Sequence, residues 1–111
     1  MDLSDIAKPR AHCLEGLAFV RDGSRDEIVP GYWTFEAYAR ISRDRIVPLL
    51  NFAYSLELPP ARSEISVCET AFRKLKEALG DRAIYLLDRG FDGWNHLAYL
   101  ERLECRFVLR L

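Results

Sequence analysis

The stretch that decides the fold is "IYLLDRGFDGW", residues 84–94. A continuous apolar run over residues 83–87 stops at Asp88, and Arg89 and Gly90 follow directly. Such a run is typical of a strand that is covered on both faces of a sheet. In open α/β sheets, reactive groups collect beyond the carboxyl ends of the strands. The sequence therefore predicts a central strand that carries the Asp88 carboxylate at its tip.

The turn after Asp88 allows two interpretations. In the first, Asp88 is a catalytic or metal-binding group held by a rigid apolar strand, and Arg89 contacts a phosphate. In the second, residues 88–90 form only a strand-to-helix turn, in which Asp88 caps the next helix. The local pattern does not decide between the two.

Two amphipathic helices are predicted. The first begins at Ser63 and ends before Gly80, because apolar residues recur at helical spacing and glycine is a good C-terminal cap. The second covers residues 92–104, with Asp92 as N-cap and leucines three residues apart on one stripe. Trp94, in its first turn, either packs into the core or stacks on a base.

The rest of the chain predicts strands and turns. Strict alternation over residues 32–41 predicts a strand with one packed face, and residues 45–58 form a second extended run. The short "SRD" between them favours a hairpin, and Pro48 predicts that the second strand lies at a sheet edge. Residues 105–111 predict a final strand, and residues 21–31 have the composition of a turn.

Composition limits the class of protein. The chain has 111 residues, half of them hydrophobic, which predicts one domain over residues 1–111. A net charge of -1 means that bulk electrostatics alone would not draw it to nucleic acid or to a membrane. Cys13, Cys68 and Cys105 are an odd number without zinc-site spacing. Without an apolar leader or membrane-length segment, a reduced, cytoplasmic protein is expected.

A second carboxylate candidate lies at the start of the sequence. "MDLSDI" places Asp2 and Asp5 in a turn that would follow a strand, of which almost nothing precedes Asp2. If that strand lies beside residues 83–87, Asp2 and Asp88 end side by side. Two close carboxylates repel each other, and Mg²⁺ or Mn²⁺ would remove that cost. For Asp5, the favoured role is the N-cap of a short helix predicted over residues 7–17.

With both aspartates placed, the chain resembles the middle of a DDE-type insertion-sequence transposase, whose catalytic domain has a ribonuclease-H-like fold. The resemblance extends over nearly the whole sequence, and the order and spacing of its blocks make it more specific than any block alone. The blocks are "DLSDIAKP" (2–9), "VRDGS" (20–24), "PGYW" (30–33), "VPLLNFAYSLELP" (47–59), "IYLLDRGFD" (84–92) and "FVLRL" (107–111).

The resemblance implies a ribonuclease-H-like α/β fold, a mixed sheet with flanking helices, truncated at both ends. It implies Asp2 and Asp88 as catalytic metal ligands for Mg²⁺ or Mn²⁺, and Arg89 as a contact to a DNA phosphate. The implied activity is DNA cleavage and strand transfer in DNA transposition. The implied partners are transposon ends and target DNA, with a possible homo-oligomer and no membrane.

The resemblance also implies a third acidic ligand, a glutamate on a helix after the last strand. Glu101 and Glu104 precede that strand, so neither corresponds to it. A chain that carries only Asp2 and Asp88 is expected to bind the metal weakly and to be inactive alone.

Two alternatives remain open. One is a non-catalytic remnant that at most binds DNA or a full-length relative. The other is a Rossmann-like phosphatase or nuclease, which also sets aspartates at strand ends. The phosphatase signature needs a D-x-D pair, whereas two residues separate the acids of "DLSD" (residues 2–5).

Overall fold

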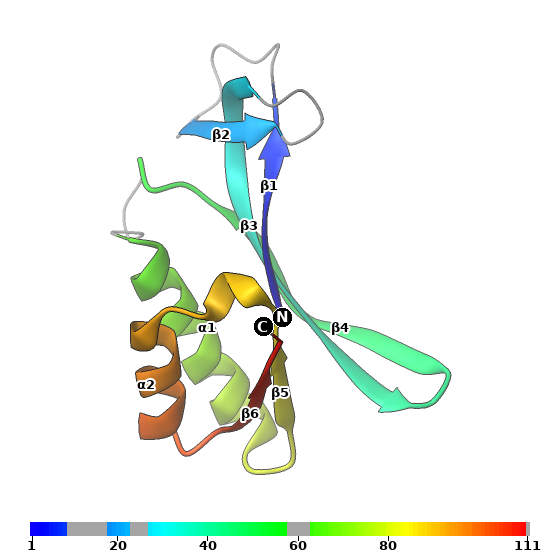
Figure 1. Ribbon diagram of the computed structural model, residues 1–111. Helices are drawn as coiled ribbons and strands as arrows, with labels where there is room; N and C mark the ends of the chain where they lie inside the picture. The colour runs from blue at the N-terminus through cyan, green and yellow to red at the C-terminus, as the bar shows by residue number, and fades with distance from the viewer. Residues whose placement is uncertain (9–17, 23–26, 58–62, 111) are drawn as a thin grey trace.

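The described part of the chain folds into two sheets and two α-helices, a mixed α/β arrangement that confirms the predicted α/β class, whereas the ribonuclease-H-like fold stays a prediction (Figure 1). A computed structural model describes residues 1–8, 18–22, 27–57 and 63–110. The short helix predicted over residues 7–17 falls mostly outside this described part. In chain order the elements are β1 (Asp2–Ala7), β2 (Ala18–Asp22), β3 (Glu27–Ser42), β4 (Arg45–Tyr54), α1 (Glu64–Leu79), β5 (Ile84–Leu87), the 3₁₀ turn η1 (Arg89–Phe91), α2 (Trp94–Arg102) and β6 (Arg106–Leu109).

The larger sheet is built around β3, which pairs antiparallel with β1, β2 and β4. The predicted hairpin is confirmed, because β3 and β4 pair from Trp33 opposite Tyr54 to Ser42 opposite Arg45. In the described part of the chain β4 pairs only with β3, so it is an edge strand, as Pro48 predicted.

Residues 21–31 were predicted as a turn, and this was wrong for residues 21, 22 and 27–31, which lie in strands; residues 23–26 lie outside the described part of the chain. β2 extends to Asp22 and β3 already begins at Glu27. Gly31 lies opposite both Ala7 of β1 and Ala18 of β2, so the two strands approach it from opposite edges of β3. A Cβ atom at Gly31 would collide with the carbonyl oxygen of Ile6 and lie 2.6 Å from a methyl carbon of Val20. The glycine permits a close crossing of strands rather than a turn.

The smaller sheet pairs β5 with β6 in parallel, and α1 and α2 lie on one side of it (Figure 1). Tyr85 and Leu87 are buried on the helix side, whereas Ile84 and Leu86 are 58% and 66% exposed. The prediction that this strand is covered on both faces was therefore wrong for the part of the chain that the structure describes. The continuous apolar run places hydrophobic side chains on both faces, but only one face has a partner.

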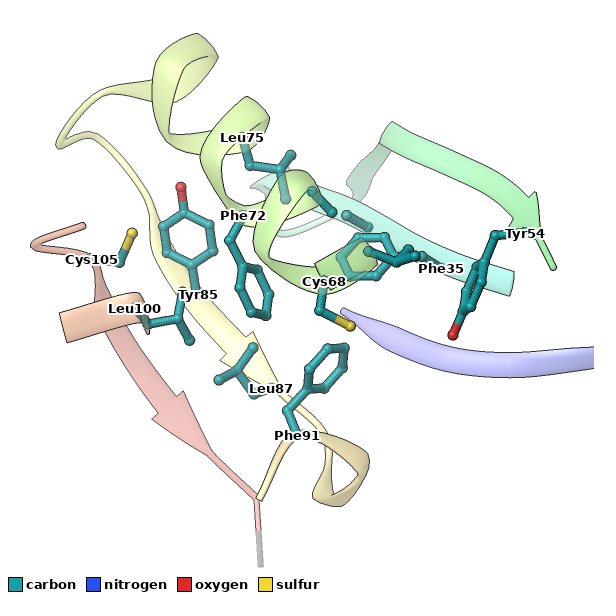
Figure 2. Packing of buried hydrophobic residues seen from close by; sticks show 13 residues of the cluster. Phe35, Tyr54, Cys68, Phe72, Leu75, Tyr85, Leu87, Phe91, Leu100 and Cys105 are labelled. Carbon is teal, nitrogen blue, oxygen red and sulfur yellow. The ribbon is translucent and has the colours of Figure 1, made fainter. Parts of the chain in front are cut away.

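The core joins the helices to both sheets. Phe35 of β3, Phe72 of α1 and Phe91 of η1 are fully buried, and their rings contact one another at centroid distances of 5.8 to 6.2 Å. Figure 2 shows the side chains of Phe72, Leu87 and Phe91 pointing toward one another. Each buried aromatic ring removes a large apolar area from water, so this cluster is the main source of stability.

α1 follows its prediction closely. Ser63 is the N-cap, and Ser63 and Ser66 form a reciprocal capping box. The helix ends at Leu79, and Gly80 takes a positive φ of 60° at the C-cap, where glycine carries no steric penalty. The buried residues of the helix are Val67, Cys68, Ala71, Phe72 and Leu75.

The second helix starts two residues later than predicted. α2 covers Trp94–Arg102 with Gly93 as its N-cap, while Asp92 closes the preceding 3₁₀ turn. Asp92 was therefore wrongly predicted as the N-cap. Trp94 is 77% exposed, so it does not belong to the core.

Candidate carboxylate site between β1 and β5

The start of β1 lies against the end of β5. The Met1 amino group donates a hydrogen bond to the carbonyl oxygen of Leu86 at 2.8 Å. Asp2 is the next residue after Met1, and Asp88 directly follows Leu87, the last residue of β5. The fold thus brings the two ends of the predicted site to the same place, although they lie far apart in the sequence.

Both carboxylates act on the same positive charge. Partial burial lowers the pKa of the Met1 amino group, whereas the negative charges of Asp2 and Asp88 raise it. Coulomb interactions fall off with distance and are screened by water. Both aspartates must therefore lie near this amino group to affect its pKa. Asp2 and Asp88 are each solvent-exposed and therefore accessible to a ligand.

Asp88 also has a structural role. Its side chain accepts a hydrogen bond of 2.7 Å from the backbone N–H of Arg89 and caps η1. Asp88 thus caps the 3₁₀ turn, whereas the α-helix that follows, α2, has Gly93 as its N-cap. A carboxylate has two oxygens and about four acceptor sites, so this single bond leaves Asp88 able to ligate a cation as well.

The side chain of Phe91 anchors the turn that carries Asp88 to the core. This side chain is fully buried and contacts His96 at a centroid distance of 5.7 Å, in addition to the two phenylalanines of the core. The backbone N–H of Phe91 donates to the carbonyl oxygen of Asp88 at 3.0 Å. A buried anchor three residues after the carboxylate limits the movement of the turn, as a binding group requires.

Asp2 lies in a different setting from the one predicted. The sequence suggested that a strand ends at Asp2, but β1 begins there and continues to Ala7. Asp5 is consequently within the strand, opposite Trp33, and is not a helix N-cap. Asp2 and Asp5 are three residues apart, so their side chains point to opposite faces of the sheet.

The register of β1 brings a further carboxylate close to Asp2. Asp2 pairs with Glu36 of β3, and side chains of directly paired residues lie on the same face. The sequence analysis missed Glu36 because only the pairing of β1 with β3 reveals this neighbour. Even so, the described residues contain no group of three or more histidine, cysteine, aspartate or glutamate side chains able to hold a metal ion.

Two exposed side chains follow Asp88 in the sequence. Arg89 follows Asp88 directly and is exposed, so its guanidinium is free to meet a phosphate. The exposed Trp94 opens α2, six positions after Asp88. Its indole could stack on an unpaired base, the second of the two roles predicted for it.

One hollow in the described part of the surface lies elsewhere. It has a volume of about 410 Å³ and is lined by residues at the beginning of β5 and β6, including Ala83, Tyr85 and Arg106. Neither Asp2 nor Asp88 lines it. This hollow is therefore not the carboxylate site.

No family model, curated protein or solved structure matches this chain. The transposase family suggested by the sequence thus stays a prediction. Within the described ranges, neither helix is long and apolar enough to span a membrane.

Proposed function

We propose that this chain belongs to the catalytic domain of a DDE-type transposase, and that Asp2 and Asp88 bind Mg²⁺ or Mn²⁺ beside a DNA phosphodiester. The observation that carries the proposal is the hydrogen bond from Met1 to Leu86, which brings the beginning of β1, with Asp2, to the end of β5, which Asp88 follows. The sequence blocks around both aspartates support it independently.

The electrostatics of the site favour a cation. Asp2, Asp88 and Glu36 bring negative charge to one region, and a phosphodiester would add more. The Met1 ammonium and the Arg89 guanidinium supply positive charge there. A divalent, oxygen-preferring ion would offset the repulsion between the carboxylates and attract the phosphate.

Each side chain has a defined task in the proposed reaction. Asp2 and Asp88 bind and orient the metal, and Arg89 holds a non-bridging phosphate oxygen by charge-assisted hydrogen bonds. A bound divalent cation supplies activation of water and stabilisation of the charge that develops on the phosphate oxygens. Trp94 stacks on a base next to the cleaved bond and keeps the strand in place.

A second candidate is a non-catalytic protein that only binds DNA. It is favoured by the capping bond of Asp88 and by the lack of a three-ligand metal group among the described residues. In this case, Asp88 is needed for the turn and not for a cation. Metal binding distinguishes the two candidates.

The test is a calorimetric titration of Mn²⁺ and Mg²⁺ into the wild-type chain and into Asp2→Asn and Asp88→Asn variants. With two carboxylates as ligands, we expect a Kd of roughly 10⁻⁴ to 10⁻³ M for the wild type. The Kd of each variant for the metal should be at least tenfold higher than that of the wild type. Asparagine keeps an oxygen that accepts the Arg89 N–H, so Asp88→Asn leaves the cap intact.

Asp44→Asn is the matched control, because it removes an exposed carboxylate from the distant hairpin turn. It should bind metal like the wild type. Equal metal binding by the wild type, Asp2→Asn and Asp88→Asn would rule out the proposed site and favour the non-catalytic candidate.

A further inference from the structure

The end of the β3–β4 hairpin projects from the body of the molecule (Figure 1). We call residues 38–49 the arm; it comprises the last part of β3, a turn at residues 43 and 44, and the first part of β4. Its large apolar side chains are exposed, with Tyr38 at 51%, Ile41 at 61% and Ile46 at 57%. The arm keeps its shape through the β3–β4 pairing and not through a core.

The charge of the arm differs from that of the whole chain. Arg40, Arg43 and Arg45 are all exposed, and Asp44 is the one acidic residue among them. The chain as a whole has a net charge of -1. Positive charge is thus concentrated at the tip of a projecting ribbon, where it complements a polyanion.

The arginines are held at the tip in a defined way. One terminal nitrogen of Arg40, Nη1, donates to the carbonyl oxygen of Arg43 at 2.8 Å across the turn. A guanidinium has five N–H donors, so this bond fixes the side chain of Arg40 and leaves other donors for a ligand. Arg45 lies opposite Ser42 at the start of β4.

The dimensions of the arm suit duplex DNA. Five residues of a strand extend about 16 Å, and the major groove of B-DNA is about 12 Å wide and accepts a two-stranded ribbon. A ribbon inserted there brings the charges of its tip near the phosphates that border the groove. The exposed Tyr38 and Ile46 would face the groove wall or the sugars.

We propose that the arm is a DNA-binding ribbon that enters the major groove and contacts phosphates through Arg40, Arg43 and Arg45. The proposal extends the proposed function to a second surface of the same protein. Glu36, opposite Asp2, lies on β3 only four residues before Arg40, about 13 Å along the strand. One duplex could therefore contact both the carboxylate site and the arm.

The test is fluorescence anisotropy with a labelled 30-base-pair duplex, at several NaCl concentrations and with EDTA present. The arm variant carries Arg40→Gln, Arg43→Gln and Arg45→Gln. Each lost phosphate contact lowers the salt dependence of binding by about one unit of the log–log slope. We expect the arm variant to bind at least tenfold more weakly, with a slope smaller by two to three units.

The matched control removes three exposed positive charges from the helices, through Arg73→Gln, Lys74→Gln and Arg102→Gln. It should bind DNA within about threefold of the wild type and keep the salt slope. Thermal melting establishes that both variants are folded. An equal loss of affinity in both variants, or no loss in the arm variant, would overturn the proposal.

Two further measurements separate the possible failures. Sedimentation of the wild type and the arm variant shows whether a second copy of the chain binds to the arm. Self-association that depends on the arm, without DNA binding, would refute the proposal. The wild type should bind DNA in EDTA through the arm, because the arm needs no metal. Loss of metal binding can thus be told from loss of the arm's role.

Discussion

Different forces hold together the arm and the rest of the described molecule, which we call the body. In the body, α1, α2 and β5 close around Phe35, Phe72 and Phe91, which are fully buried. In the arm, backbone pairing continues while the side chains stay exposed. The comparison indicates that stability comes from one region, which leaves the other free to carry charge.

β3 connects the two regions and belongs to both. Phe35 is buried in the aromatic cluster, whereas Tyr38, three residues later, is 51% exposed. An isolated two-stranded hairpin is at best marginally stable in water. The arm therefore depends on the body, because β3 is anchored there by Phe35.

The largest expected effect in the body is that of Phe91→Ala. The variant removes a ring that contacts Phe35, Phe72 and His96. A buried phenylalanine truncated to alanine costs about 3–5 kcal/mol, a large share of the stability of a typical domain. Urea unfolding followed by circular dichroism measures the change.

The counterpart in the arm is Ile46→Ala, at a side chain that is 57% exposed. Its free energy of unfolding should stay within about 0.5 kcal/mol of the wild type. Similar losses for Phe91→Ala and Ile46→Ala would show that the arm packs against something in solution, and the contrast between the two regions would be lost.

A smaller effect is expected where β1 and β2 cross β3. Gly31→Ala places a methyl group against the carbonyl oxygen of Ile6, so a strand must shift. Such overpacking typically costs about 1–3 kcal/mol. Gly90→Ala is the control, since its added Cβ would meet no atom within 4 Å. Chemical denaturation of both variants tests this; equal stabilities would contradict the tight crossing.

The sequence predicted those elements whose signals are local. α1 could be predicted because Ser63, Gly80 and the apolar stripe between them lie within one segment. The β3–β4 hairpin could be predicted because strict alternation stops at a short polar connection. The position of Asp88 at a strand tip followed from the end of an apolar run.

Features that depend on distant segments could not be predicted. The pairing of Asp2 with Glu36 depends on the register between two strands, which no local pattern specifies. Gly31 was interpreted as a chain breaker, because a glycine that permits a close crossing has the same sequence signature as a turn. Trp94 is three residues before Leu97 and thus continues the leucine stripe, yet it lies at the first position of α2 and is exposed.

The body should also respond to pH through His96. This imidazole contacts the rings of Phe72 and Phe91, and its buried Nδ1 atom has no hydrogen-bond partner among the described residues. Burial lowers the pKa of His96, although Glu64, Glu69 and Asp92 raise it to a lesser extent. The unfolded chain, with its usual pKa of about 6.5, therefore binds the proton more readily than the folded protein.

The sign of the pH effect follows from that difference. The contribution of His96 to stability is fully present above about pH 6.5 and falls as the pH decreases, with a slope of at most about 1.4 kcal/mol per pH unit. His96→Phe keeps an aromatic ring in the cluster and should remove this part of the pH dependence. Urea unfolding at pH 5.5 and pH 7.5 measures it; unchanged pH dependence in His96→Phe would show that His96 is not responsible.

The smallest effect is expected at the boundary between body and arm, where Asp2 faces Glu36 across the β1–β3 pairing. Like charges directly opposite each other destabilise a sheet, and one such pair is worth about 0.2–1 kcal/mol. Glu36→Gln should therefore raise the free energy of unfolding by that amount at low salt, and the gain should shrink in 1 M NaCl because salt screens exposed charges. Glu57→Gln, at an exposed glutamate outside the β1–β3 ladder, is the control and should change little. If Glu36 shares a cation with Asp2, Glu36→Gln would also weaken Mn²⁺ binding by more than about threefold. If the two carboxylates only repel each other, the affinity for Mn²⁺ should change by less than about threefold.

A gain in stability that persists at high salt would mean that Glu36 acts through packing. The carboxylates at this boundary would then lie too far apart for a measurable electrostatic interaction.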